Sequence, residues 1–389
     1  MAKRNIFRGL AAVLALGMCM TGLAGCGNEK RADGKTEIEV VSYKPEAVKA
    51  FEKIEKRFNE THDDIHLTIS SPNEAMTILK TRFIREDYPD IIAIGGDINY
   101  SNFLDADLFD DISDLDEVQT IKQAYLDMDK ELEFIPKDGT YALPYVANAA
   151  GILYNKDLFE QAGITEEPKT WDEFKDVCQK LKDAGITPMT MDDAYATCVI
   201  GYHLARLVGE DKVKEIVTEG EWDDPAVLQM AQDIEELASN GYYSEMVGSN
   251  VWPAGQNTEL ALGTAAMYLN GSWLPNEVKE MAGPDFHWGC FAYPALTDGA
   301  NGIETNNFGA QVFGINKDTK LAKEAFDLIT FLTKGEYDQK LADETVGIPA
   351  DTTNTEWPAM VECAKPVIEQ STNRFTWACG VESNVDMTP

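Results

Sequence analysis

The stretch GTYALPYVANAAGILYNKDLF (residues 139–159) decides the fold. Residues 141–144 predict a short strand that Pro144 must end or place at the edge of a sheet. Small residues then lead into a second predicted strand at 151–154, and Asn155 follows as the N-cap of a helix. A strand that passes through small residues into another strand is typical of a hinge in the floor of a cleft. We therefore expect the chain to cross between two domains here.

Size and charge limit what the chain can be. Its 389 residues exceed what one hydrophobic core usually holds, so two domains are expected. Hydrophobic residues make up 44% and charged residues 26%, as in ordinary globular proteins. The formal net charge is −34, which repels nucleic acid and anionic lipid head groups. Nucleic-acid binding is thereby excluded.

The N-terminus has the pattern of a secretory signal. Three basic residues precede an apolar run at 10–20, which is too short for a membrane span. The residues that follow, Leu23-Ala24-Gly25-Cys26, resemble a bacterial lipobox, in which the cysteine carries the lipid. We expect a signal peptide at 1–25, lipidation of Cys26 and a polar tether at 26–35. The alternative is a plain signal peptide with an incidental cysteine.

Five cysteines follow Cys26 and show neither metal-ligand nor redox spacing. Cys178 lies among apolar residues on a predicted helix, so we expect it to be buried. A disulfide among the other four is not assigned.

Residues 38–94 alternate between strand and helix patterns in the order β-α-β-α-β, which indicates an open α/β sheet. Ala47, Phe51, Ile54 and Phe58 form one apolar helical stripe. Ligands of such sheets bind beyond the carboxyl ends of the strands. Two predicted loops meet that condition, 43–44 with Tyr43 and Lys44, and 95–99 with Asp97. The alternative reading of the second loop is a surface turn.

The second half of the chain contains further helix and strand signals. Thr170-Trp171-Asp172-Glu173 is a capping box for a helix to residue 183. Strands are predicted at 186–191, 265–269, 286–293 and 312–315, and helices begin near 225 and 320. Residues 270–273 form the turn after the 265–269 strand and end in Trp273. A second small-residue joint follows at 346–349.

These motifs, in this order, resemble family 1 of the bacterial extracellular solute-binding proteins, the sugar receptors of ABC importers, similar in plan to maltose-binding protein. The resemblance extends to about residue 350. It implies an α/β, two-lobed fold of the type II periplasmic-binding-protein class, with open mixed sheets flanked by helices and a ligand cleft between the lobes. We expect lobe 1 at 36–146 and 307–346, and lobe 2 at 147–306 and 347–389. The family usually ends with more helices, so the C-terminus is either truncated or different.

The resemblance also implies a function and a set of binding residues. It implies a carbohydrate receptor, anchored by lipid outside the cell membrane, that delivers its ligand to an ABC permease. Trp273 is the leading candidate for stacking on a sugar ring, and Asp97 for accepting hydroxyl hydrogen bonds. The other candidates are Tyr43, Lys44, Asn148, Tyr195, Trp252 and Trp377, and the last three are equally consistent with core or rim positions.

An enzymatic function is not supported by the sequence. The four histidines lack metal-ligand spacing, and no nucleophile-elbow motif occurs. Acidic pairs that a glycosidase would need arise by chance among 67 acidic residues. We expect a monomer with neither cofactor nor metal. Two alternatives remain, a ligand-binding sensor for a membrane histidine kinase and a receptor for another solute such as a peptide or polyamine.

Overall fold

The computed structural model describes residues 33–44, 47–72, 74–96, 98–115, 118–119, 121–131, 133, 137–251, 254–351, 353–371 and 373–374. Several predictions fall outside these residues: the signal peptide, Cys26, Asp97, Trp252 and Trp377. Within them, no helix is both long enough and apolar enough to cross a membrane. No cluster of potential metal ligands occurs in the same part of the chain.

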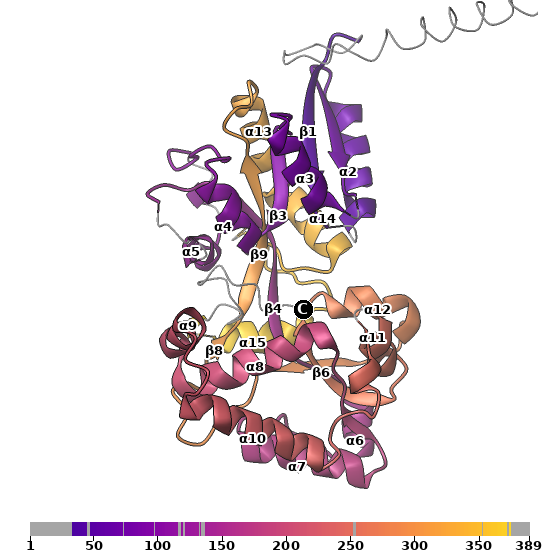
Figure 1. Cartoon of the computed structure of the whole chain (residues 1–389). Helices are drawn as coiled ribbons and strands as arrows, with labels where there is room; N and C mark the ends of the chain where they lie inside the picture. Colours follow the sequence, from indigo (N-terminus) through magenta and orange to yellow (C-terminus); the bar gives the residue numbers. More distant parts are fainter. Residues whose placement is uncertain are drawn as a thin grey trace, which may run out of the picture.

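The first lobe is built on the predicted β-α-β-α-β order (Figure 1). Its strands β1, β2 and β3 are parallel, and β3 pairs antiparallel with β9. The whole apolar stripe predicted on the first helix is buried. The elements of this lobe are β1 (Thr36–Ser42), α2 (Val48–Thr61), β2 (Ile65–Ser70), α3 (Ala75–Ile84), β3 (Ile91–Gly95), α4 (Ile98–Asp105), α5 (Gln123–Glu131), β9 (Phe308–Ile315), α13 (Ala322–Leu332) and α14 (Gly335–Thr345).

A single long strand, β4 (Leu143–Asn155), connects the two lobes. Its first part pairs with β9, and its part from Ala150 onward pairs with β6 and β7. The prediction of two separate strands was therefore wrong. Pro144 does not end the strand, because β4 is at the edge of the first-lobe sheet, where a missing N–H costs no ladder hydrogen bond. The small residues between the predicted strands are β4 itself, with a bulge at Val146.

The second lobe lies around β4, β5, β6 and β7, with helices on its outer faces (Figure 1). Its elements are α6 (Lys156–Gln161), α7 (Trp171–Asp183), β5 (Thr187–Met189), α8 (Asp193–Val208), α9 (Glu210–Glu219), α10 (Pro225–Ser239), the 3-10 turn η3 (Val247–Ser249), α11 (Ala254–Ala261), β6 (Ala265–Gly271), α12 (Leu274–Ala282), β7 (Trp288–Phe291), β8 (Thr305–Asn306), the turn η4 (Glu362–Ala364), α15 (Lys365–Gln370) and β10 (Asn373–Arg374).

The predicted helix starts at Asn155 and Thr170 are confirmed. The Asn155 side chain accepts hydrogen bonds from the first backbone N–H groups of α6. Thr170 and Glu173 form the reciprocal capping box of α7. Helices α8 and α9 are absent from the sequence-based prediction, which passes directly from the 186–191 strand to the helix near 225.

The two lobes have separate hydrophobic cores. One core gathers side chains from β1, β3, β9, α2 and α13, and the second lobe holds two further clusters around β6 and β7. Cys178 is buried, as predicted. The cysteines at 178, 198, 290 and 363 are all free thiols, and Cys379 lies outside the described residues.

Candidate functional site

Strand ends from both lobes meet at the crossing. In the first lobe, Gly95 at the end of β3 pairs with Gln311 of β9, and the same Gln311 pairs with Tyr145 of β4. In the second lobe, Gly271 at the end of β6 pairs with Ala150 of β4. The loops that follow β3 and β6 therefore lie near the crossing strand, on opposite sides of the boundary between the lobes. This is the place where open α/β sheets bind ligands.

Trp273 lies directly beyond β6, at the start of α12, and is half-buried. Its indole lies against the backbone of Gly271, where a Cβ atom would be 2.1 Å from the ring carbon Cζ3. Any residue other than glycine at 271 would displace the indole. Between them, Ser272 donates its N–H to the carbonyl oxygen of Ala149 at 2.8 Å, and its Oγ accepts the Ala149 N–H at 3.2 Å. The tryptophan is therefore held beside the crossing.

Tyr195 lies next to Trp273, although 78 residues separate them in the sequence. The Trp273 Nε1–H donates a hydrogen bond to the Tyr195 hydroxyl oxygen at 3.2 Å. The Tyr195 ring meets the Tyr268 ring edge to face, with centroids 5.3 Å apart. Burial raises the pKa of Tyr195, and the negative charge of Glu277 raises it further. The phenol therefore stays protonated and can still donate its own hydrogen.

Asp192 holds this aromatic group in place. One carboxylate oxygen accepts the backbone N–H of Tyr195 at 2.7 Å and caps α8. The other accepts the hydroxyl of Tyr268 at 2.7 Å. Burial is the main cause that raises the pKa of Tyr268, and its neighbours Tyr195 and Asp192 add to it. Asp192 is 1% exposed, so it positions the tyrosines and does not itself face solvent.

Five of the eight predicted binding residues lie in the part of the chain that the structure describes. Tyr195 and Trp273 touch each other, and Asn148 lies half-buried on β4, two residues before the partner of Gly271. Tyr43 and Lys44 follow β1 in the first lobe and are both half-buried, with Tyr43 packed against the first-lobe core.

Sequence reasoning missed Asp192, Tyr268 and Glu277. Of these, only Asp192 carries a readable signal, because an aspartate three residues before Tyr195 is an N-cap pattern.

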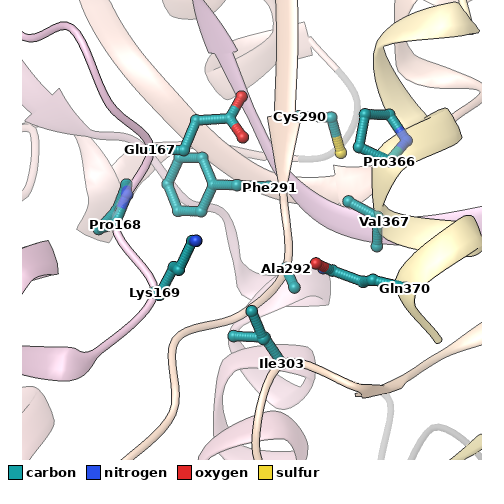
Figure 2. Close-up of a pocket in the computed structure, with 10 residues that line it drawn as sticks. All are labelled: Glu167, Pro168, Lys169, Cys290, Phe291, Ala292, Ile303, Pro366, Val367 and Gln370. Carbon is teal, nitrogen blue, oxygen red and sulfur yellow. The ribbon is translucent and has the colours of Figure 1, made fainter. Parts of the chain in front are cut away.

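A separate pocket lies in the second lobe, between the segment before α7, strand β7 and the C-terminal helix α15 (Figure 2). Phe291, Ile303 and Val367 give it apolar walls, and Glu167 and Gln370 add polar groups. Glu167 is already engaged, since its Oε1 accepts the Tyr154 hydroxyl at 2.8 Å. None of the predicted binding residues that the structure describes lines this pocket.

Two lobes joined by a crossing strand, with aromatic and polar side chains at the strand ends beside it, define a two-lobed ligand-binding receptor. The comparison with known families agrees with this class. Residues 39–339 match the model of the bacterial extracellular solute-binding proteins, and the chain belongs to that family. The predicted family and the prediction that the protein is a receptor and not an enzyme are confirmed.

Individual relatives and solved structures are similar to this chain. The chain is 28% identical over 344 residues to the multiple sugar-binding protein of Streptococcus mutans serotype c (strain ATCC 700610 / UA159), covering 84% of this chain and 79% of the relative. The structure of the present chain is similar to that of RafE in complex with raffinose, with a TM-score of 0.74, 23% sequence identity and 90% of each chain covered. Apo RafE from Streptococcus pneumoniae also gives a TM-score of 0.74, at 24% identity, covering 91% of this chain and 90% of RafE. The predicted two-lobed fold is thereby confirmed.

Proposed function

We propose that this protein captures a carbohydrate between its lobes and delivers it to the permease of an ABC importer. The contact between Trp273 and Tyr195 beside the crossing carries the proposal. Sugars present apolar ring faces and hydroxyl groups together, so their sites combine aromatic surfaces with hydrogen-bonding side chains. A half-buried indole with a protonated phenol at its edge offers both. A sugar-binding relative and a raffinose-bound structure of the same fold support this ligand class.

The full binding set that we propose draws on both lobes. Trp273 and Tyr195 contact the ligand from the second lobe, and Asn148 contacts it from the crossing. Tyr43, Lys44 and Asp97 contact it from the first lobe. Trp252 and Trp377 remain candidates for the rim of the cleft. The proposed division of the chain is lobe 1 at 36–146 and 307–346, and lobe 2 at 147–306 and 347–389.

A thermal-shift screen tests the function. We expect at least one of raffinose, melibiose, sucrose, maltotriose or diacetylchitobiose to raise the melting temperature without being hydrolysed. A ligand at a hundred times its Kd adds about 2.7 kcal/mol to the folded state, which for a chain of this size corresponds to a shift of a few degrees. Stabilisation by peptides or polyamines, with no response to any sugar, would assign the receptor to another solute class.

We further propose that the protein is a monomer, anchored on the outer face of the cell membrane by a lipid on Cys26. The basic head, the short apolar run and Leu23-Ala24-Gly25-Cys26 support the anchor. Replacing Cys26 by serine in the producing bacterium should release the protein from the membrane fraction and remove the mass of the lipid. Membrane association and mass that are the same in the variant and the wild type would contradict lipidation.

A further inference from the structure

Two valines in this protein have an unusual backbone conformation. Val146 has φ 42° and Val346 has φ 54°, in the left-handed region that glycine favours. The other non-glycine residues with positive φ in the described part of the chain are a glutamate and two aspartates on the surface. Both valines are buried, at 4% and 6% exposure. Because a β-branched residue is strained in this region, surrounding contacts must hold each valine there.

Both valines are close to the crossing. Val146 is the extra residue of the β4 bulge, between Tyr145 and Ala147, where the pairing of β4 with β9 shifts register. Val346 ends helix α14 in the left-handed position that usually belongs to glycine. Ala147 and Ile348 then exchange both backbone hydrogen bonds, at 2.8 and 3.0 Å. The end of α14 is thereby attached to the crossing strand at the bulge.

The contact made by Gly347 explains why a valine, Val346, has the strained left-handed backbone conformation at the end of α14. A Cβ atom at Gly347 would be 2.0 Å from the Cγ1 of Val146 and 3.3 Å from its Cβ. The Val146 side chain thus occupies the space that a side chain at 347 would need. The φ of Gly347 is not in the left-handed region, so glycine is required there for space and not for conformation. The helix end would favour glycine at 346, but the contact with Val146 demands it at 347.

We propose that Val146, Val346 and Gly347 form a hinge latch, a packed contact that sets the angle between the two lobes. A bulge re-aims its strand, and β4 is a strand that carries the chain from one lobe to the other (Figure 1). The conformation at Val146 therefore directs the second lobe relative to the first, and the contact with Gly347 fixes that conformation. Hinge residues absorb large φ/ψ changes during domain closure. The three residues are positioning residues for ligand capture, a role that rests on the proposed function.

Small-angle scattering of the unliganded protein tests the latch without any sugar. Gly347→Ala places a methyl group against Val146, so the contact must open and the radius of gyration should change. Val146→Ala removes the opposing Cγ atoms, so the double variant Val146→Ala/Gly347→Ala should return toward the wild-type curve. Gly248→Ala is the control, because a Cβ there meets nothing within 4 Å and its φ is not positive. A Gly347→Ala curve identical to the wild type would overturn the latch.

Binding and stability measurements separate the remaining explanations. For a sugar that binds the wild type, Gly347→Ala should change the Kd about fivefold or more, and the double variant should restore it in part. Coupling between the two sites in unfolding free energy, with unchanged scattering, would mean a purely structural contact and would refute the proposal. If Gly347→Ala does not fold, Val146→Ala alone removes the Cγ atoms that pack against Gly347, and unchanged scattering in it would likewise refute the latch. Absence of sugar binding in the wild type would contradict only the proposed function.

Discussion

Asp192 is the residue on which the order of the candidate site depends. It is buried, and its two carboxylate oxygens hold the start of α8 and the Tyr268 hydroxyl. Through these two contacts it fixes both tyrosines, and Tyr195 in turn fixes the orientation of the Trp273 indole. A carboxylate that accepts two hydrogen bonds at 2.7 Å keeps this group ordered before a ligand arrives. Such preorganisation reduces the entropy that binding must overcome.

The hydroxyl of Tyr195 can be tested alone. Tyr195→Phe keeps the ring but removes the acceptor for the Trp273 Nε1–H, so we expect the free energy of unfolding to fall by about 0.5–1.5 kcal/mol. Sugar affinity should fall up to about tenfold, because the indole loses its fixed orientation. Urea denaturation and calorimetric titration measure the two effects. Tyr243→Phe, at a partly buried tyrosine packed against the core of the same lobe, is the control. Equal sugar affinity in the wild type and both variants would show that this hydrogen bond does not shape the site.

At the scale of single elements, α7 and α8 show what the sequence reveals and what it hides. Helix α7 has a capping box and one apolar face, and both are visible in the sequence. Helix α8 contains Gly201 and several β-branched residues, which are weak helix formers. It is also buried on several sides, and His203 and Arg206 are fully covered, so no polar face marks its period. Its stability comes from tertiary packing, which a local pattern does not record.

The sequence does not show that β4 is one continuous strand, for a related reason. Pro144 and the small residues after it resemble a strand end and a loop. Pairing with β9 and then with β6 and β7 keeps the backbone extended through all of them. The crossing between the lobes in this stretch was predictable from its small residues. The bulge at Val146 was not, because it depends on the contact with Gly347, about 200 residues away in the sequence.

At the scale of the whole molecule, the two-lobed plan was predictable because it depends on the order of the motifs. The composition of the site was predictable only in part. Trp273 and Tyr195 could each be proposed from their position beyond a strand, but their contact depends on how β6, α8 and α12 pack in three dimensions. Tyr268 and Glu277 join the site through that packing alone, whereas Asp192 also has an N-cap pattern that the sequence shows.

The central claim is that a carbohydrate binds in the cleft against Trp273. Calorimetric titration of the wild type, Trp273→Ala and Trp222→Ala, with the sugar that gives the largest thermal shift, tests it most directly. Trp222 is an exposed tryptophan of the same lobe and serves as the control. We predict that Trp273→Ala weakens binding by about 1–3 kcal/mol, while the free energy of unfolding of the unliganded protein falls by no more than about 1.5 kcal/mol, the range expected for the lost hydrogen bond to Tyr195. Affinity close to the wild type in Trp273→Ala, together with a large loss of stability, would contradict the claim and make Trp273 a core residue.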